Sequence, residues 1–248
     1  MVPESQINDK IQEFVKRVRD AAGPNVEAIV LFGSAATADF HPGLSNVNLF
    51  CVLRDASFPS LQALSPAIKW WNRQRQPPPL CMTRTELVHS ADVFAIELLD
   101  MVRNHRVLFG DDVLQGLKIS THLHRIQVEY ELREKLILLR KHFLAAADDD
   151  THLWDVLLHS VPSFATLFGH ALIALGFDAA AGRHQAIQAL SKQVQFDPSA
   201  FEQALNVREG KIDKKQLDVH DLCGRYLTSI EKVVAAVDRV FESETGHG

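Results

Sequence analysis

The sequence predicts two domains: an α/β (α+β) N-terminal domain with a small mixed sheet, and an all-α C-terminal helical bundle. Two observations predict this division. Residues 1–115 alternate short apolar runs with amphipathic segments, the pattern of a sheet with helices packed on it. Residues 116–248 change to long segments with apolar residues at helical spacing, the pattern of a bundle. The boundary is therefore expected near Gly110–Gly116.

The N-terminal domain is predicted to begin with a helix and two strands. Apolar residues at helical spacing predict a helix over residues 5–22, which Gly23-Pro24-Asn25 ends. Val26–Phe32 and Val47–Leu53 are nearly continuous apolar runs and predict buried strands, the second of them covered on both faces. Gly33-Ser34 is predicted to form the turn that leaves the first strand.

The rest of this domain is predicted to alternate helices and strands. Thr83 followed by Glu86 resembles a capping box and predicts the start of a helix through Ser90. The remaining expected elements are a short helix over Ala35–Asp39, a helix over residues 58–75, and strands over Leu80–Met82, Val93–Leu98 and Arg106–Phe109. The helices expected in the bundle span residues 120–145, 151–176, 182–195, 198–206 and 216–242.

Composition indicates a soluble globular protein. Hydrophobic residues make up 46% of the chain and charged residues 23%, enough for two cores. The net charge of -5, with neither half basic, disfavours extended nucleic-acid binding. The polar N-terminus predicts no signal peptide, and no apolar run suggests a membrane span. Three scattered cysteines in apolar surroundings are expected to be buried free thiols, so a cytoplasmic location is expected.

One ordered pattern resembles a known family. A strand, Gly33-Ser34, a loop and a second strand resemble the signature of the DNA polymerase β-like nucleotidyltransferase superfamily. In minimal members of this superfamily, Ser-Asp-x-Asp opens the second strand; here Ser45 precedes Asn46-Val47-Asn48. Residues 94–114 resemble the family's third and terminal strands, and the bundle is similar to the C-terminal domain of kanamycin nucleotidyltransferase-like proteins.

The resemblance implies nucleotidyl transfer from a nucleoside triphosphate to an acceptor hydroxyl. Two acids at i and i+2 on a strand point to one face and can hold Mg²⁺, which neutralises the triphosphate. Gly33, Ser34 and Ser45 are then the implied nucleotide-binding residues: the glycine allows close approach of the backbone to the phosphates, and Ser34 can donate its hydroxyl at a helix N-terminus. The cleft between the domains is the implied nucleotide site.

Asn46 and Asn48 depart from this pattern. They keep the spacing and the size of two aspartates but lose both negative charges, which argues against Mg²⁺. If each loss costs ~3 kcal/mol in the transition state, the rate falls at least ~100-fold per residue. Another interpretation is that both asparagines only bond loop backbone. Glu97, on the expected third strand, is the candidate third acid, and Asp100 is the fallback.

The sequence therefore favours a degenerate nucleotidyltransferase-fold protein that acts as a nucleotide-binding or regulatory module. Two alternatives stay open. An active enzyme would transfer a nucleotidyl group to a small-molecule or protein hydroxyl, with Glu97, Asp100, Asp39 or Asp55 replacing the lost acids. A non-catalytic interaction protein would act through the bundle, by which a homodimer could also form. A nucleoside triphosphate is the expected ligand.

Overall fold

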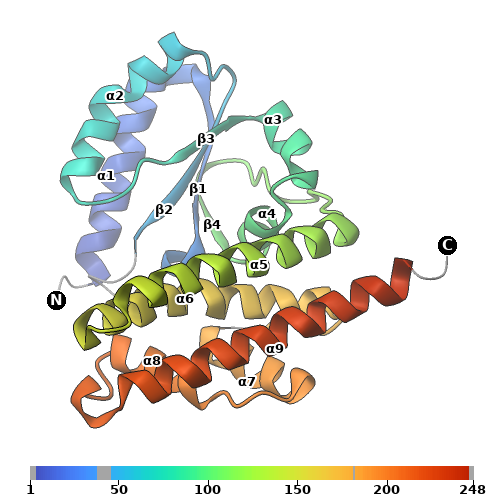
Figure 1. Ribbon diagram of the computed structural model, residues 1–248. Coiled ribbons are helices and arrows are strands. Elements are labelled where there is room, and N and C mark those ends of the chain that lie inside the picture. Colours follow the sequence, from blue (N-terminus) through green and yellow to red (C-terminus); the bar gives the residue numbers. More distant parts are fainter. Residues whose placement is uncertain (1–3, 38–45, 181, 246–248) are drawn as a thin grey trace. The chain divides into compact units, whose positions relative to one another are not determined.

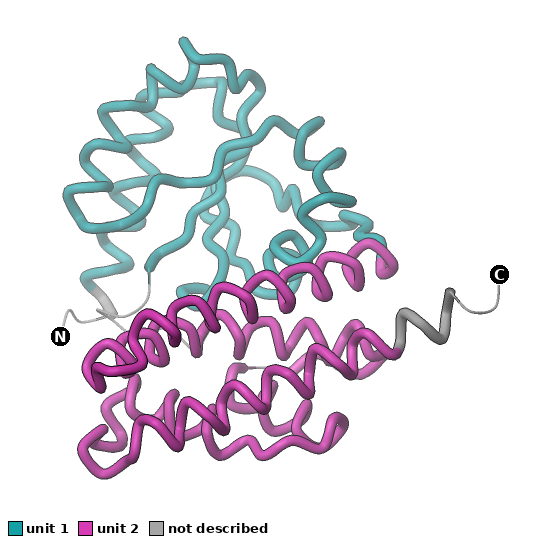
Figure 2. Tube along the Cα trace, viewed as in Figure 1, with its two compact units in different colours: residues 1–120 teal, residues 121–248 magenta. Residues whose placement is uncertain are grey.

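The computed structural model describes residues 4–37, 46–180 and 182–245 (Figure 1). The chain forms two compact units, Met1–Ser120 and Thr121–Gly248 (Figure 2). The first contains strands and helices and the second only helices among its described residues, which agrees with the fold class expected from the sequence. The domain boundary expected between residues 115 and 116 stays a prediction.

A mixed sheet organises the N-terminal unit. Its strands are β1 (Val26–Phe32), β2 (Asn48–Leu53), β3 (Leu80–Thr83) and β4 (His105–Gly110). They lie in the order β3-β2-β1-β4. β1 is antiparallel to both of its neighbours, whereas β3 runs parallel to β2. The two runs predicted as buried strands form the two central strands, because their apolar side chains can pack on both faces.

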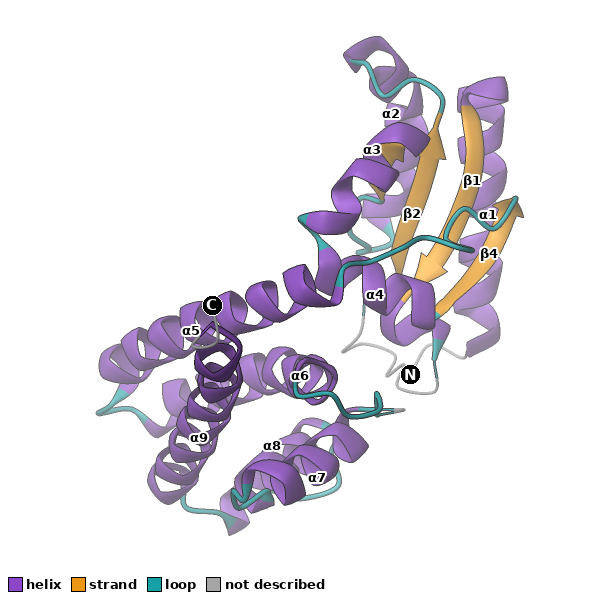
Figure 3. Ribbon diagram, turned by 90° about the vertical axis from the view of Figure 1, so that its right-hand side faces the viewer, coloured by secondary structure: helices purple, strands orange, loops and turns teal. Residues whose placement is uncertain are grey.

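Helices cover both faces of this sheet (Figure 3). These helices are α1 (Glu4–Ala22), α2 (Phe58–Arg73), α3 (Arg84–His89) and α4 (Ala95–Arg103). On one face α1 and α2 pack Phe14 and Trp71, whose ring centroids are 4.8 Å apart, over Ile29 and Leu31. On the other face Leu87 of α3 and Leu98 of α4 cover the alternate residues of the central strands. The strand period of two thus gives the sheet two separate cores.

Local signals in the chain start and stop these elements. The expected capping box is present, because the Thr83 hydroxyl accepts the Glu86 N–H at 3.2 Å and Glu86 Oε2 accepts the Thr83 N–H at 2.7 Å. Among the described residues, four short 3₁₀ turns link other elements: Gly23–Asn25, Gly33–Ala36, Ser90–Asp92 and Lys214–Gln216. The second of them stands where a short helix was expected over Ala35–Asp39, whose last residues lie outside the described part of the chain.

The strand expected over Val93–Leu98 is wrong. These residues lead into α4, which begins at Ala95. Ala95, Leu98 and Met101 follow one another at a spacing of three residues and are all buried, which is the pattern of a helix that packs one stripe on the sheet. A window of six residues fits both a helix and a strand, and the longer run through Met101 distinguishes them.

The C-terminal unit is a helical bundle around one central helix. Its helices are α5 (Thr121–Ala146), α6 (Asp150–Ala174), α7 (Arg183–Val194), α8 (Ser199–Arg208) and α9 (Val219–Thr245). Residues of α6 contact each of the other four. Its aromatic residues Phe164 and Phe168 are fully or almost fully buried, and Phe168 packs on Phe196 and Phe201. All five helices lie within a few residues of their expected positions.

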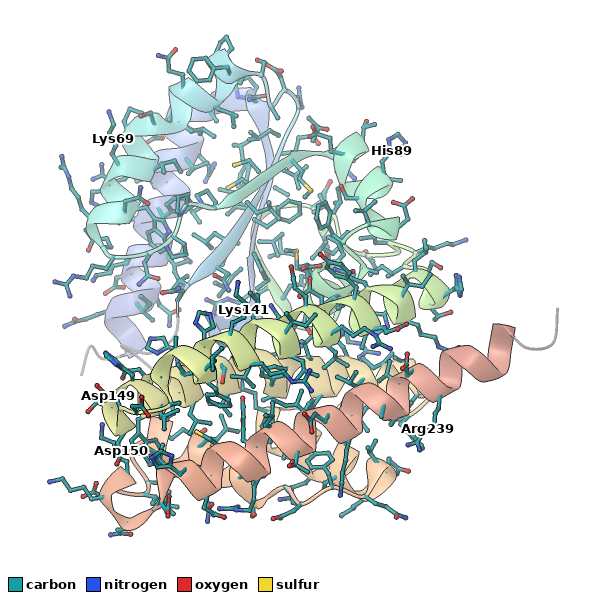
Figure 4. The ribbon with its side chains drawn as sticks, viewed as in Figure 1. Lys69, His89, Lys141, Asp149, Asp150 and Arg239 are labelled. Carbon is teal, nitrogen blue, oxygen red and sulfur yellow. The ribbon has the colours of Figure 1, made fainter. Side chains whose placement is uncertain are left out.

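The sequence specifies both the start and the burial of α6. Asp149 precedes the helix, and its Oδ1 accepts the N–H groups of Thr151 at 2.8 Å and His152 at 3.1 Å. Figure 4 labels Asp149 and Asp150 at this end of the helix. By length and composition alone, α6 is the one described helix that could cross a membrane. This is weak support for a span, because a helix buried in a bundle core is equally apolar.

Candidate functional site

Strand register brings several polar residues to one end of the sheet. Phe32, the last residue of β1, lies opposite Asn48 of β2 and also opposite His105 of β4. Directly opposed residues in antiparallel strands point to the same face, so Asn48 and His105 flank the end of β1 on one face. The chain leaves β1 between them through Gly33 and Ser34. Gly33, Ser34, Asn48 and His105 are together called the β1-end site below.

Gly33 has a conformation and a neighbour that favour glycine. Its φ of +72° is in the left-handed region, where a side chain is strained. A Cβ at this position would lie 3.1 Å from Nδ2 of Asn48, so the Asn48 amide is packed against the backbone of the turn. The turn continues as a short 3₁₀ segment in which the carbonyl of Ser34 accepts the N–H and the hydroxyl of Thr37, each at 3.2 Å. The helix N-terminus expected at Ser34 is therefore a tight turn.

Val47, which lies between the two asparagines, is held in place by burial and by a backbone hydrogen bond. Val47 is fully buried in the core on the α1 and α2 side, and its N–H donates to Oε1 of Gln76 at 2.8 Å. Asn48 follows on the opposite face and is half-buried, whereas Asn46 is exposed. These two interactions of Val47 fix where the strand starts, and they therefore fix the direction of the Asn48 side chain. Ser45, the third polar residue expected here, lies outside the described residues.

The four described strands carry one acidic residue, and it is at the other end of the sheet. Glu27, near the start of β1, pairs with Arg54 at 3.4 Å and Arg84 at 3.5 Å. Neither β3, with the sequence LCMT, nor β4, with the sequence HRVLFG, contains a carboxylate. Within the residues that the structure describes, no group of three or more His, Cys, Asp or Glu could hold a metal ion.

The other candidate acids are not on a strand next to Asn48. Glu97 and Asp100 were expected as a strand acid and its fallback, but both lie on α4, and Glu97 is exposed. The expected strand position of Glu97 is wrong because the buried residues of this segment recur at helical spacing, which favours α4. Asp55 follows the far end of β2, where it accepts hydrogen bonds from Ser57 and Ser60, which lower its pKa. Asp39 lies outside the described residues.

A histidine–aspartate pair that sequence reasoning missed lies at the β1-end site. Nε2 of His105 is 3.1 Å from both carboxylate oxygens of Asp112, which also accepts the Leu114 N–H at 3.1 Å. Burial alone would raise the pKa of Asp112, but these hydrogen bonds hold it below its ordinary value. Asp112 is therefore an anion that orients the His105 ring. The turn at Gly110 returns the chain so that residues seven apart can meet.

The N-terminal part of the chain is similar to a known protein domain. The family model described as the nucleotidyltransferase domain matches residues 11–101, which include β1, β2 and the turn between them. Residues 11–101 are therefore similar in sequence to a nucleotidyltransferase domain. The match confirms the resemblance seen in Gly33-Ser34 and the two apolar runs. That Asn46 and Asn48 stand at the family's acidic positions stays a prediction.

A likeness of fold extends over the helical part of the chain. The structure is similar to a spectinomycin adenyltransferase from Enterococcus faecialis, whose crystal structure contains ATP and spectinomycin. The match has a TM-score of 0.57 and 14% sequence identity, and it covers 91% of this chain and 98% of that chain. At this identity the likeness shows the fold, including an N-terminal nucleotidyltransferase domain with a helical domain after it. A search of curated proteins finds no match.

Proposed function

We propose that this nucleotidyltransferase-fold protein binds a nucleoside triphosphate at the β1-end site without a metal ion, and that metal-dependent nucleotidyl transfer is lost or very weak. The observation that carries the proposal is that neutral amides, Asn46 and Asn48, stand where the family resemblance implies carboxylates, with Nδ2 of Asn48 packed against Gly33. The protein would then act as a nucleotide-responsive binding or regulatory module.

The donor groups at this site suit an anion. Asn48 carries an amide N–H₂ group, and Ser34 carries a hydroxyl. Such groups can donate to phosphate oxygens, whereas two aspartates can only accept and need a cation between themselves and the phosphates. The positive φ of Gly33 leaves no side chain between the turn and a ligand. A triphosphate held by these donors would not need Mg²⁺ to reach the site.

The same substitutions weaken catalysis. Mg²⁺ takes hard oxygen ligands, and an amide oxygen supplies a dipole in place of a full charge. If each lost carboxylate costs ~3 kcal/mol of transition-state stabilisation, two losses together slow transfer ~10⁴-fold. No acid on the four described strands stands in for them, since Glu27 lies at the far end of β1. We therefore propose that nucleotide binding is retained although nucleotidyl transfer is lost or very weak.

A second candidate is an active adenylyl transferase that modifies a small-molecule hydroxyl. Two observations favour it: the fold likeness to an adenyltransferase crystallised with ATP and spectinomycin, and the His105–Asp112 pair. A histidine held by a carboxylate can take the proton of an acceptor hydroxyl. This function would show as ATP-dependent modification of an aminocyclitol or a related polyol, and it would be lost in His105→Gln.

Calorimetric titration of ATP tests the first proposal directly. We expect the wild-type protein to bind ATP equally well in EDTA and in Mg²⁺. In the double variant Asn46→Asp/Asn48→Asp, binding should become weak in EDTA and recover with Mg²⁺, because two restored carboxylates repel the triphosphate until a cation neutralises them. Asn72→Asp, an exposed position on α2, is the matched control and should behave as the wild type.

The same titrations can overturn the proposal. Binding by the wild type that appears only with Mg²⁺ would mean that a metal site persists despite the two amides, and the transferase would become the leading reading. A wild type that binds no nucleoside triphosphate in either condition would refute both candidates and leave the interaction protein.

A further inference from the structure

Two cysteines face each other across neighbouring strands of the N-terminal sheet. In the parallel ladder between β2 and β3, Cys51 is the register partner of Cys81. Both side chains lie on the sheet face that α1 and α2 cover, because Cys51 belongs to that core and Cys81 packs against it. Cys81 Sγ also lies 3.9 Å from the carbonyl oxygen of Pro79, and neither cysteine is part of a disulfide. The fold therefore places the two thiols side by side on one face of the sheet.

We propose that Cys51 and Cys81 form a reversible intramolecular disulfide when the protein meets a hydroperoxide. Neighbouring strands are about 4.8 Å apart, which falls within the Cα separation that a disulfide spans. A pair joined directly across a ladder has less than ideal Cβ geometry, and strained disulfides are the more easily reduced ones. This pair therefore suits a redox-sensitive modification site and not a permanent crosslink.

The surroundings of the two thiols assign their order of reaction. Cys81 lies on β3, the edge strand, and is half-buried, whereas Cys51 lies on the second strand and is fully buried. The hydrogen bond from Cys51 lowers the pKa of the Cys81 thiol and outweighs the opposing effect of its burial. For Cys51, the hydrogen bond to Cys81 and burial both raise the pKa of the thiol. Cys81 is thus the thiol that an oxidant can reach and that forms a thiolate first.

The chemistry balances with one molecule of hydrogen peroxide. The Cys81 thiolate attacks one peroxide oxygen, the O–O bond breaks, hydroxide leaves and takes up a proton, and Cys81 becomes a sulfenic acid. The Cys51 sulfur then attacks the Cys81 sulfur. The S–O bond breaks, and the oxygen leaves as water with the proton of Cys51. Two thiols are oxidised and one peroxide is reduced to two waters. A dithiol reductant reverses the result by thiol–disulfide exchange.

The third cysteine provides an internal control. Cys223 lies in α9 of the other unit and is buried, and burial raises the pKa of its thiol to about 12. A thiol with so high a pKa forms almost no thiolate near neutral pH and should not react. Under the same oxidant, therefore, the edge-strand cysteine should react and the buried helical cysteine should not.

Peptide mapping of the full-length protein tests this site. After treatment with hydrogen peroxide, the protein is unfolded in urea, alkylated and digested with trypsin without reduction. Cys51 then lies in the peptide of residues 20–54 and Cys81 in that of residues 76–84. We expect one crosslinked species that joins these two peptides, forms equally in the Cys223→Ala variant and disappears on treatment with dithiothreitol. The peptide of residues 216–225, which contains Cys223, should remain alkylated.

Single variants test the order of reaction without needing the crosslink. In Cys51→Ala a dimedone probe should label Cys81, because the sulfenic acid has lost its partner. In Cys81→Ala the same probe should leave Cys51 unlabelled. Alanine is used because it introduces no new polar group into the core around Cys51.

Three results would overturn the proposal. The first is oxidation of Cys81 beyond the sulfenic acid in the wild type with no peptide crosslink, since Cys51 would then not resolve it. The second is a crosslink that includes Cys223 or joins two chains. The third is labelling of Cys51 in the Cys81→Ala variant, which would reverse the assigned order.

Discussion

Replacing Gly33 with alanine tests whether the turn after β1 is shaped for a ligand. The change puts a side chain at φ +72°, where a non-glycine residue costs about 1–2 kcal/mol. It also puts Cβ 3.1 Å from Nδ2 of Asn48, a few tenths of an ångström closer than an ordinary contact, so the amide must shift by about that amount from its position. If that N–H₂ group donates to a phosphate, its loss costs about 1.5–3 kcal/mol. ATP affinity should then fall at least about tenfold.

Gly116→Ala is the matched control. Gly116 has φ +78°, almost the same strain, and a Cβ there would meet nothing within 4 Å. Both variants should lose a similar free energy of unfolding in urea, and only Gly33→Ala should lose ATP affinity in calorimetry. Equal ATP affinity in the two variants would refute the assignment of this turn to phosphate binding. A much larger stability loss in Gly33→Ala would show that the Asn48 amide has no room to move.

Three further predictions concern stability. Gly110→Ala should lower the free energy of unfolding in urea by about 3 kcal/mol or more, because its Cβ would lie 2.0 Å from the Glu27 carbonyl oxygen. A loss of stability equal to that of Gly116→Ala would contradict this prediction. Thr83→Ala removes the α3 cap and should cost about 1 kcal/mol, seen as faster hydrogen exchange in α3; unchanged exchange would count against the cap. Burial alone would lower the pKa of His184, but its hydrogen bonds to two glutamates hold it above the ordinary 6.5. That stabilisation is complete below about pH 6.5 and is lost as the pH rises through the raised folded-state pKa. The stability advantage of the wild type over His184→Gln should therefore shrink as the pH rises above about 6.5; an advantage that grows would contradict the raised pKa.

Local signals were sufficient for most of the framework. The nearly continuous apolar runs of β1 and β2 identify the central strands, because only strands covered on both faces can bury successive apolar side chains. The Thr83–Glu86 box marks a helix start through two reciprocal hydrogen bonds that depend on neighbours three residues apart. Such features need no knowledge of distant parts of the chain.

Features that depend on contacts between distant parts of the chain could not be predicted from local signals. Glu97 was assigned to a strand because Val93–Leu98 fits two periodicities, and tertiary packing of Leu98 and Met101 on the sheet selects the helix. The pairing of His105 with Asp112 depends on where β4 begins opposite Phe32 and on the turn at Gly110. A positive-φ glycine directly after an apolar run is the signal that could have suggested such a return of the chain.

Amides in place of carboxylates at positions 46 and 48 weaken the binding of a metal ion and add hydrogen-bond donors for phosphate. Both effects follow from the same loss of negative charge. Two unit charges 4 Å apart interact with about 4 kcal/mol at an effective dielectric of 20, so aspartates at Asn46 and Asn48 would repel a triphosphate unless a cation lay between them. Amides of the same size remove that repulsion and add N–H donors. Glu27, the one acid on the described strands, is paired with Arg54 and Arg84 at the far end of β1, and the Asp112 carboxylate at the near end is paired with His105. Weak metal-dependent transfer and metal-free nucleotide binding are therefore expected to have the same cause. The Asn46→Asp/Asn48→Asp variant should strengthen metal-dependent transfer and weaken metal-free binding together. A variant that gained Mg²⁺-dependent binding while keeping its metal-free affinity would break that link and show that the phosphates are held away from the two amides.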